Sequence, residues 1–403
     1  MSVPIRQTLA VLSHVWKNRL LGNTRYPLVL MLEPLMRCNL ACAGCGKIQH
    51  PPEVLKRHLT VDQCCDAAEQ CGAPIVSIPG GEPLLHPQID QIVSGLVRLK
   101  RFVYLCTNAI KLEESLVRFT PSAHLAFSVH VDGPRELHDR AVCRAGVFDK
   151  AISAIRAARA AGFRVTTNTT IFSHTRKDDL TELFDTLTQL GVEGMMVSPG
   201  FAYEKAPDQQ HFMNDRQATN LLDEVMQHSH ARHWRFNQSP LYLQFLRGRW
   251  SMDCTPWGSP TYNLFGWQRP CYLIDEGYVA SFGELMSATN WSAYGHQSGN
   301  EKCAQCMTHC GFEPTAVAQT LTSWRGMRGT IQAMARPHSL PPVANSFAQG
   351  NSMPKRERPA SQTCSGQTCS RAEGALVTIQ TAPTSESRKR AADAVSALNS
   401  NYL

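Results

Sequence analysis

The sequence predicts an α/β protein built around a parallel sheet, and three observations support this fold class. Short apolar runs alternate with amphipathic stretches from about residue 26 to residue 200. The runs have the length of buried strands, and several of the stretches end on glycine, as helices often do. Strands that alternate with helices form repeated βα units and a parallel sheet. Six such units predict either a doubly wound sheet or a partial TIM-like barrel.

The strands and helices can be assigned in order along the chain. The six predicted strands are the runs YPLVLMLEP, APIVSIPGG, RFVYLCTN, AHLAFSVHVDG, FRVTTNTTIF and GVEGMMVSPG. Helices are expected between them, for example in LTVDQCCDAAEQCG, VFDKAISAIRAARAAG and KDDLTELFDTLTQLG. In both architectures, functional side chains gather at the carboxyl ends of the strands. Functional residues are therefore expected just after the apolar runs.

Three further segments flank the predicted sheet domain of residues 26–213. Residues 1–25 place apolar side chains at helical spacing, with basic ones elsewhere on the wheel. This pattern predicts an amphipathic helix that either lies on an anionic membrane or packs across the bottom of the sheet. Residues 214–325 combine a helical part with a cysteine-rich part of little periodicity. Residues 337–403 are rich in Ser, Ala, Pro and Gln, which is typical of a disordered tail.

Composition and charge exclude several classes of protein. Apolar residues make up 43% of the chain, but no run approaches the roughly 20 apolar residues that a membrane-spanning helix needs. The N-terminus lacks a clean secretory pattern, so we expect a cytoplasmic protein, with peripheral membrane contact if the first helix is interfacial. The net charge of +7 is mild for 403 residues, and about +3 of it follows residue 336. A nucleic-acid partner is therefore not expected.

Three cysteines follow the first predicted strand in the segment CNLACAGC. Fifteen cysteines in a reducing compartment indicate metal binding or catalysis rather than disulfides. The Cys-x3-Cys-x2-Cys spacing of Cys38, Cys42 and Cys45 supplies soft thiolates, which select an iron–sulfur cluster or zinc. A structural zinc site needs a fourth ligand, and the nearest candidate, His50, has a spacing that matches no usual zinc finger. We therefore favour an iron–sulfur cluster with one open position.

Polar residues also follow the next three predicted strands. Gly80, Gly81, Glu82 and Pro83 form a tight turn that places a carboxylate at the end of the second strand. Strand side chains alternate between faces, so one apolar set in each of the next two strands would pack under helices. The opposite set would then face the inside of a barrel, and it contains Cys106, Asn108, Ser128, His130 and Asp132. Turn formation is the alternative role for the Asn and the Asp.

A second group of cysteines lies in the C-terminal part of the chain. Its members are Cys254, Cys271, Cys303, Cys306 and Cys310, and the last three are spaced as Cys-x2-Cys-x3-Cys. Three interpretations stay open for this group: a second iron–sulfur cluster, a zinc site, or reduced structural thiols. Cys64, Cys65 and Cys71 fall on a predicted helix and are expected to serve packing.

The cysteine loop and the GGEP turn one strand later resemble the radical S-adenosylmethionine (SAM) superfamily. The resemblance implies a partial (βα)6 TIM-like barrel with a small cysteine-rich C-terminal extension. It implies that Cys38, Cys42 and Cys45 hold a 4Fe–4S cluster whose open position takes the amino and carboxylate groups of SAM. The GGEP turn would receive the SAM ammonium, and the polar strand ends would hold its ribose and carboxylate. Gly44 stands where the family usually has an aromatic residue, which leaves contact of this loop with adenine open.

The second cysteine group resembles part of the auxiliary-cluster domain of many radical SAM enzymes, the SPASM or twitch type, although the full pattern has more cysteines. Segments outside these motifs carry a narrower resemblance. YPLVLMLEPLMRCNLACAGCGKIQ, VSPGFAYEKAPDQQHF, FNQSPLYLQFLRG and CMTHCGFEPTAV are similar to the radical SAM enzymes that form adenosylhopane in bacterial hopanoid biosynthesis. This likeness spans about residues 1–320.

The narrower resemblance implies a reaction. A one-electron reductant such as a flavodoxin or ferredoxin would drive cleavage of SAM, and the resulting 5′-deoxyadenosyl radical would add to the alkene of diploptene. The tertiary carbon radical so formed must then gain a hydrogen atom. Cys106 is the predicted donor, because a thiol S–H bond is weak and this residue would face the lumen.

Two other functions stay open. One is a radical SAM enzyme that modifies another substrate such as a peptide, which the auxiliary-type cysteines would suit. The other is a non-enzymatic iron–sulfur or zinc protein. The latter predicts no cleavage of SAM and leaves the GGEP turn unexplained.

Overall fold

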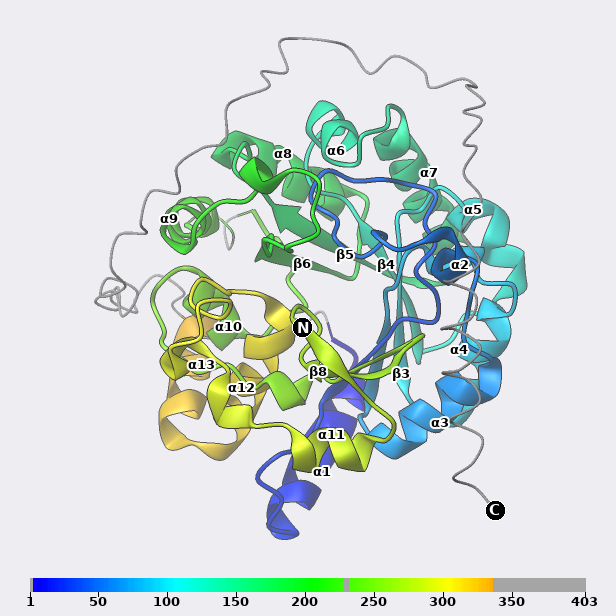
Figure 1. Cartoon of the computed structure of the whole chain (residues 1–403). Helices are drawn as coiled ribbons and strands as arrows, with labels where there is room; N and C mark the ends of the chain where they lie inside the picture. Colours follow the sequence, from blue (N-terminus) through cyan, green and yellow to red (C-terminus); the bar gives the residue numbers. More distant parts are fainter. Residues whose placement is uncertain (1–2, 228, 230–231, 336–403) are drawn as a thin grey trace, which may run out of the picture. The chain divides into compact units, whose positions relative to one another are not determined.

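Figure 1 shows the computed structural model of the chain, in which residues 3–227, 229 and 232–335 are described. The chain divides into two units, residues 1–349 and 350–403, and all described residues lie in the first. The predicted disordered tail of residues 337–403 lies outside the described residues. In the described part, nine strands form one sheet in the order β6-β5-β4-β3-β2-β1-β7-β8-β9.

Six parallel strands form the main part of the sheet, as the sequence predicts. They are β1 (Val29–Leu32), β2 (Ile75–Ile78), β3 (Phe102–Thr107), β4 (Leu125–His130), β5 (Arg164–Ile171) and β6 (Gly194–Pro199). Each strand pairs in parallel with the one before it. Figure 1 shows the connecting helices along the outer side of the curved sheet. This sequential order is that of a partial TIM-like barrel and excludes the doubly wound alternative.

The strands are joined by connecting helices, of which those expected at residues 59–72, 147–162 and 177–191 have bounds close to the predicted ones. They are α2 (Pro52–Leu55), α3 (Val61–Cys71), α4 (Ile89–Arg98), α5 (Leu112–Ser115), α6 (Arg135–Ala141), α7 (Val147–Ala160) and α8 (Lys177–Gln189). Thr60 starts α3 with a capping box. Gly72, Gly162 and Gly191 follow α3, α7 and α8 with φ of 68°, 83° and 67°, which confirms the glycine ends.

The core lies between the sheet and these helices. Alternate side chains of β3 and β4, among them Val103, Leu105 and Phe127, are fully buried in it. Burying a side chain of this size stabilises the fold by about 1.5–3 kcal/mol. Cys64 and Cys71 on α3 join the same core, as expected for packing residues, whereas Cys65 is only partly buried. Because side chains alternate along a strand, the other side chains of β3 and β4 face the inside of the barrel.

The C-terminal part continues the same sheet, which the sequence analysis did not predict. Its strands are β7 (Thr261–Asn263), parallel to β1, and the antiparallel pair β8 (Gly266–Pro270) and β9 (Asp275–Val279). The predicted helical part contains α9 (Asp215–Met226) and α10 (Pro240–Leu246). The remaining helices are α11 (Phe282–Ala288), α12 (His309–Thr322) and α13 (Trp324–Ala335). Short 3-10 helices are η1 (Pro83–Leu85), η2 (Leu116–Arg118), η3 (Gln209–His211), η4 (Pro256–Gly258), η5 (Trp291–Ala293) and η6 (His296–Ser298).

The predicted N-terminal helix is α1 (Ile5–Leu20). It packs on the barrel through Gln7 and Val15, and the hydroxyl of Tyr104 on β3 donates a hydrogen bond to the Gln7 side chain at 3.0 Å. The helix therefore packs on the barrel, one of its two predicted roles. Within the described residues, no helix combines the length and hydrophobicity needed to cross a membrane.

Candidate active site

The three cysteines of the predicted cluster lie on the loop that follows β1. The backbone N–H of Cys45 donates to the carbonyl of Cys42 at 3.1 Å, so the loop turns back on itself. The thiols are close enough to influence one another electrostatically. Burial, with smaller contributions from neighbouring acids and thiols, raises the pKa of Cys38 to about 11 and also raises that of Cys42. A bound metal centre would reverse this trend, because cations stabilise thiolates.

This donor set fits an iron–sulfur cluster. Three soft thiols share one loop, while the ring of His50 packs against Phe265 with 5.6 Å between ring centroids. Among the described residues, no three His, Cys, Asp or Glu side chains are placed to hold a single metal ion. A cubane cluster holds its thiolates farther apart than a single ion does, so this spacing is compatible with a cluster.

The GGEP turn is bonded directly to the cysteine loop. The backbone N–H groups of Gly81 and Glu82 donate to the carbonyls of Leu35 and Arg37 at 3.0 and 2.9 Å. Gly80 has φ of 90°, and a Cβ added to Gly81 would overlap the carbonyl of Arg37. Both glycines are therefore required by the close approach of the two backbones.

The carboxylate of Glu82 ties this turn to the end of β3. Its oxygens accept hydrogen bonds from the Leu84 N–H at 3.1 Å, the Thr107 hydroxyl at 2.8 Å and the Asn108 N–H at 2.9 Å. Burial raises the pKa of Glu82 to about 7, against the opposing effect of these hydrogen bonds. The carboxylate is 1% exposed, so it fixes the position of the turn and leaves backbone groups to meet a ligand.

Asn108 connects β3 to the cysteine loop. Its side-chain amide donates to the Asn39 side chain at 2.7 Å and lies 3.8 Å from the Cys38 sulfur. Its side-chain oxygen accepts from the Ile110 N–H at 3.1 Å, which is the turn geometry considered as its alternative role. The residue therefore forms a turn and also reaches a predicted cluster ligand.

His130 and Asp132 form an ion pair at the end of β4. The His130 Nε2 lies 2.8 Å from one oxygen of Asp132, and the Thr170 N–H donates to the other at 2.8 Å. Burial opposes ionisation of both groups, but their mutual attraction outweighs it, so the pKa of Asp132 is lowered and that of His130 is raised. Both oxygens of Asp132 have partners in the protein, and the His130 side chain, which is 34% exposed, is the member open to a ligand.

Cys106 lies between two serines on neighbouring strands. Its sulfur is 3.4 Å from the Ser77 hydroxyl on β2, and it is paired in register with Ser128 on β4. Burial raises the pKa of Cys106 to about 11, which keeps the thiol protonated near neutral pH. The sequence analysis placed Cys106 and Ser128 on one face, and the structure brings them together.

The sequence analysis missed a half-buried cation next to the cysteine loop. The Lys47 ammonium lies 3.3 Å from the Glu33 carboxylate, donates to the Tyr272 carbonyl at 2.9 Å and lies 3.9 Å from the centroid of the Tyr272 ring. Tyr203 covers it from another side and packs against Gly46. Glu33 directly follows β1, so Glu33 could have been found from the sequence as a polar residue at the carboxyl end of a predicted strand.

The space beside Gly44 is filled by an aromatic ring from elsewhere. A Cβ at Gly44 would lie 2.9 Å from the ring of Phe172, which follows β5, and 3.1 Å from the ring of His211. The loop therefore lacks its own aromatic residue but lies against two rings from other segments.

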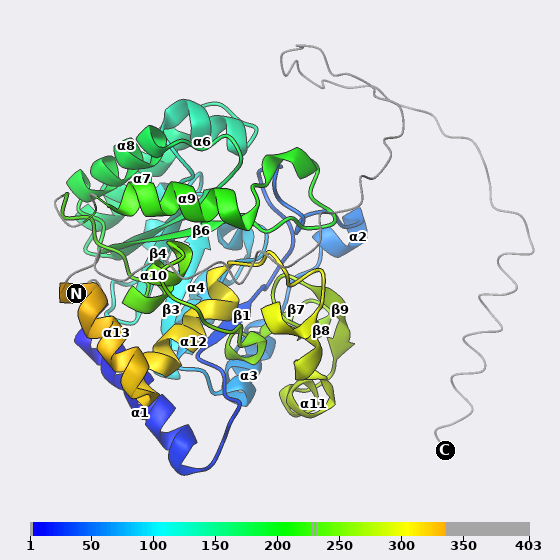
Figure 2. The same cartoon turned by 90° about the vertical axis from the view of Figure 1, so that its left-hand side faces the viewer.

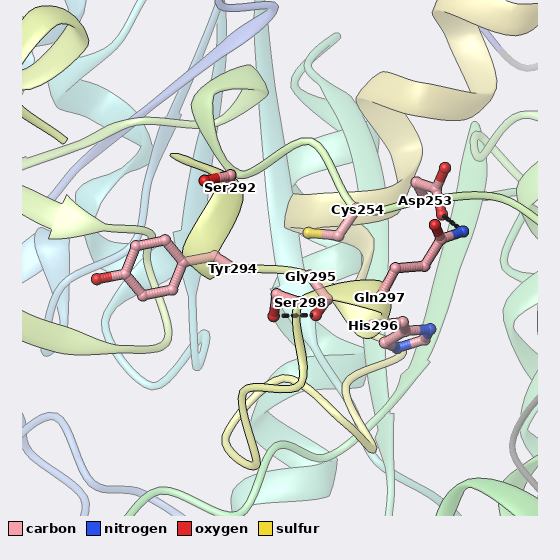
Figure 3. Close-up of a pocket in the computed structure, with 8 residues that line it drawn as sticks. All are labelled: Asp253, Cys254, Ser292, Tyr294, Gly295, His296, Gln297 and Ser298. Atoms are coloured by element: carbon pink, nitrogen blue, oxygen red, sulfur yellow. Dashed lines mark hydrogen bonds between the residues drawn. The ribbon is translucent and has the colours of Figure 1, made fainter. Parts of the chain in front are cut away.

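The five cysteines of the second group converge from three segments. Cys254 follows α10, Cys271 follows β8, and the last three lie in or just before α12. Burial and the other four thiols raise the pKa of Cys254, and burial raises that of Cys271 to about 12. Figure 3 shows a pocket beside this group, where Cys254 lies near residues 295–298 and Gln297 donates to Asp253 at 2.6 Å.

Two family models match consecutive parts of the chain. Residues 32–187 match the radical SAM superfamily, and residues 195–330 match a domain of unknown function, DUF3463. An AdoMet-dependent heme synthase of Methanosarcina barkeri is 29% identical over 177 residues, which cover 43% of this chain and 50% of that protein. A GTP 3',8-cyclase 1 of Mycobacterium tuberculosis is 27% identical over 183 residues, which cover 42% and 48%. The chain therefore spans about half the length of these curated relatives.

Solved structures share the fold. Native anSMEcpe with bound AdoMet superposes with a TM-score of 0.51 at 15% identity, over 77% of this chain and 98% of that one. Streptococcus suis SuiB bound to S-adenosylmethionine gives 0.50 at 17% identity, over 62% and 61%. This likeness confirms the partial barrel. The radical SAM family uses a 4Fe–4S cluster and SAM, the two cofactors that the sequence predicts. Over residues 32–187, the chain therefore matches the radical SAM superfamily.

Proposed function

We propose that this protein is a radical SAM enzyme that joins the deoxyadenosyl group of SAM to diploptene and so forms adenosylhopane for hopanoid biosynthesis. The observation that carries the radical SAM chemistry is the single hydrogen-bonded unit made by the cysteine loop, the GGEP turn and the end of β3. The choice of substrate rests on the resemblance of several segments to the hopanoid enzymes. Diploptene is insoluble in water, so the enzyme would take it from a membrane, from the cytoplasmic side.

Each predicted site residue of the barrel has a role in this proposal. Cys38, Cys42 and Cys45 would hold the cluster. When bound and reduced by a flavodoxin or ferredoxin, the cluster would supply the electron that cleaves SAM. The backbone of the GGEP turn would bind the SAM ammonium. The strand-end side chains that would surround the rest of SAM are Asn108, Ser128, His130 and Asp132.

Cys106 would complete the reaction as hydrogen-atom donor. Addition forms a carbon–carbon bond between the deoxyadenosyl carbon and the terminal alkene carbon, and it leaves an unpaired electron on the tertiary carbon. The S–H bond of Cys106 would break to form the final C–H bond. One electron from the reductant and one proton would then restore the thiol. The pKa of about 11 supports this role, because the residue keeps its hydrogen at neutral pH.

An anaerobic assay tests the proposal. Reconstituted protein is incubated with SAM, a reductant and diploptene, and the products are read by mass spectrometry. We expect a saturated adenosyl–C30 adduct from the wild type. Cys106→Ala should still cleave SAM but lose the saturated adduct, whereas Cys65→Ala, a matched change on α3, should leave it intact. A saturated adduct formed at the normal rate by Cys106→Ala would show that another group is the donor.

The other outcomes separate the rival functions. Free 5′-deoxyadenosine without adduct would keep the radical SAM chemistry but reject diploptene. It would favour another substrate such as a peptide, an alternative suited by the convergence of five cysteines next to the barrel. Intact SAM in the presence of a reducible cluster would favour a non-enzymatic iron–sulfur protein. Zinc without sulfide would favour a zinc protein.

A further inference from the structure

Two helices, α1 and α13, expose most of their large apolar side chains. We call this set of eight side chains the apolar face: Ile5, Leu9, Trp16 and Leu20 on α1, and Trp324, Met327, Ile331 and Met334 on α13, which are between 40% and 84% exposed. Among the described residues, the other exposed large hydrophobic side chains are Leu21, Val117 and Phe265. Large apolar side chains that are exposed together in this number mark an interaction site.

The orientation of α1 turns its apolar stripe outward. Ile5, Leu9, Trp16 and Leu20 lie within one narrow arc of the helix, since they follow the spacing of 3.6 residues per turn. The side that contacts the barrel contains Gln7, which is bonded to Tyr104. The barrel side therefore buries the polar Gln7 together with the smaller Val15, whereas the larger apolar side chains of the stripe are exposed, a reversal of the usual arrangement in a globular protein.

The same reversal occurs on α13. Its buried side consists of Gly326, Gly329 and Ala333. A Cβ on Gly329 would lie 2.7 Å from the Trp250 ring, so the helix packs closely and has no freedom to rotate its large side chains inward. Small residues face the protein, and Trp324, with its three apolar neighbours on the stripe, faces away from it.

The two helices belong to one side of the molecule. The guanidinium of Arg19, at the end of α1, donates to the carbonyl of Thr322 at 3.2 Å, just before α13 begins. Figure 2 shows both helices along the same edge, at the lower left of the view. The two helices that carry the exposed apolar side chains therefore lie at the same edge of the molecule.

The charges on these helices identify the partner. Arg6, Lys17, Arg19, Arg325 and Arg328 are exposed, and neither helix contains an acidic residue. Basic side chains around an apolar stripe suit the headgroups of anionic lipids, and tryptophan favours the membrane interface. A second copy of this face would bring like charges together. The chain after residue 336 also carries more basic than acidic residues, so it is a poor complement for the same reason.

We propose that α1 and α13 together form a docking surface for an anionic lipid bilayer. The eight apolar side chains would enter the headgroup and acyl boundary, and the five basic residues would contact lipid phosphates. This inference does not depend on the reaction proposed above, because lipid binding is measured without SAM or diploptene.

Vesicle flotation of the full chain tests the surface. We expect the wild type to float with vesicles of equimolar phosphatidylglycerol and phosphatidylcholine, and to float less with phosphatidylcholine alone or at high salt. The double variant Leu20→Glu with Ile331→Glu should lose about tenfold or more in partitioning, since each change places a carboxylate at the lipid boundary. Val117→Glu is the matched control, because Val117 is 90% exposed on η2 and lies outside the surface.

Three results would overturn the proposal. The first is equal flotation of the double variant and the control. The second is a wild type that stays in the lipid-free fraction with both kinds of vesicle. The third is a concentration-dependent dimer, measured by light scattering, that the double variant dissociates, since the face would then bind a second copy. Each variant is checked by circular dichroism and by SAM cleavage, which we expect to be unchanged.

Discussion

At the scale of single residues, Lys47 shows how the cysteine loop is joined to the C-terminal part. Its ammonium neutralises the fully buried Glu33 carboxylate and bonds to Tyr272. Lys47→Met would leave that carboxylate without its cation, and breaking a buried ion pair in this way costs about 3–5 kcal/mol. We expect a loss of this size in the free energy of unfolding, measured by urea titration.

Two controls isolate the ion pair. Adding Glu33→Gln to Lys47→Met should recover much of the lost stability, because the uncompensated charge is removed. Lys302→Met removes an exposed lysine that bridges Glu204 and Glu276, and it should cost less than about 1 kcal/mol. Equal losses in the free energy of unfolding for the two lysine substitutions would show that the pair of Lys47 and Glu33 stabilises the protein no more than an exposed pair does.

Glu313 predicts a pH dependence of stability. Its carboxylate accepts one hydrogen bond from the Ser239 N–H at 2.6 Å, and burial raises its pKa to about 8. The folded state therefore keeps a proton that the unfolded chain has released. This contribution to stability is fully present below the unfolded pKa of 4.5 and is lost as the pH rises towards 8.

The expected slope of this loss is at most about 1.4 kcal/mol per pH unit. Glu313→Gln should flatten the decline in the urea midpoint between about pH 5 and about pH 8. Part of the decline should persist, because the pKa of Glu82 is also raised, to about 7. A variant with an unchanged slope would contradict the assignment to Glu313.

At the scale of elements, the site depends on the docking of the GGEP turn against the cysteine loop. Gly81→Ala would drive a methyl group into the carbonyl of Arg37, so the turn must separate from the loop. We expect a loss of about 2 kcal/mol or more in the free energy of unfolding, together with weaker SAM binding measured by calorimetry. In Gly283→Ala, the added methyl meets nothing within 4 Å on α11, so this control should be neutral or stabilising.

The elements of the barrel could be predicted because local signals agree with the global fold. Apolar runs, capping residues and helix-ending glycines all indicate the same six units, and the structure confirms them. Strands β7 to β9 were missed for a physical reason. They are three to five residues long and show little apolar alternation, and β8 and β9 contain Gly or Pro. Their structure is therefore decided by pairing, of β7 with β1, of β8 with β7 and of β9 with β8.

At the scale of the whole molecule, the site also divides into residues with a local sequence signal and residues that only long-range contacts bring together. Residues that follow β2, β3 and β4 could be found from the sequence, because parallel strands end at one edge of the sheet. The cage around Lys47 could not, because Tyr203 and Tyr272 reach it from distant segments that fold back over the loop. Contacts of such long sequence separation carry no local pattern.

The convergence of the second cysteine group leads to a prediction about the metal content of the whole chain. If both groups hold clusters, replacing Cys38, Cys42 and Cys45 by Ala should leave about half of the iron and sulfide of the reconstituted wild type. Replacing the five cysteines of the second group should leave the other half. Both contents are measured after anaerobic reconstitution.

The fate of the remaining metal decides among the three interpretations of the second group. Iron with sulfide in the triple variant would show a cluster held by Cys254 and its neighbours, and zinc alone would show a zinc site. A triple variant without any metal would reduce the group to structural thiols. That last result would fit the burial of Cys303 and Cys310, which are 7% and 6% exposed, and would leave the barrel site as the single metal centre supported by the described residues.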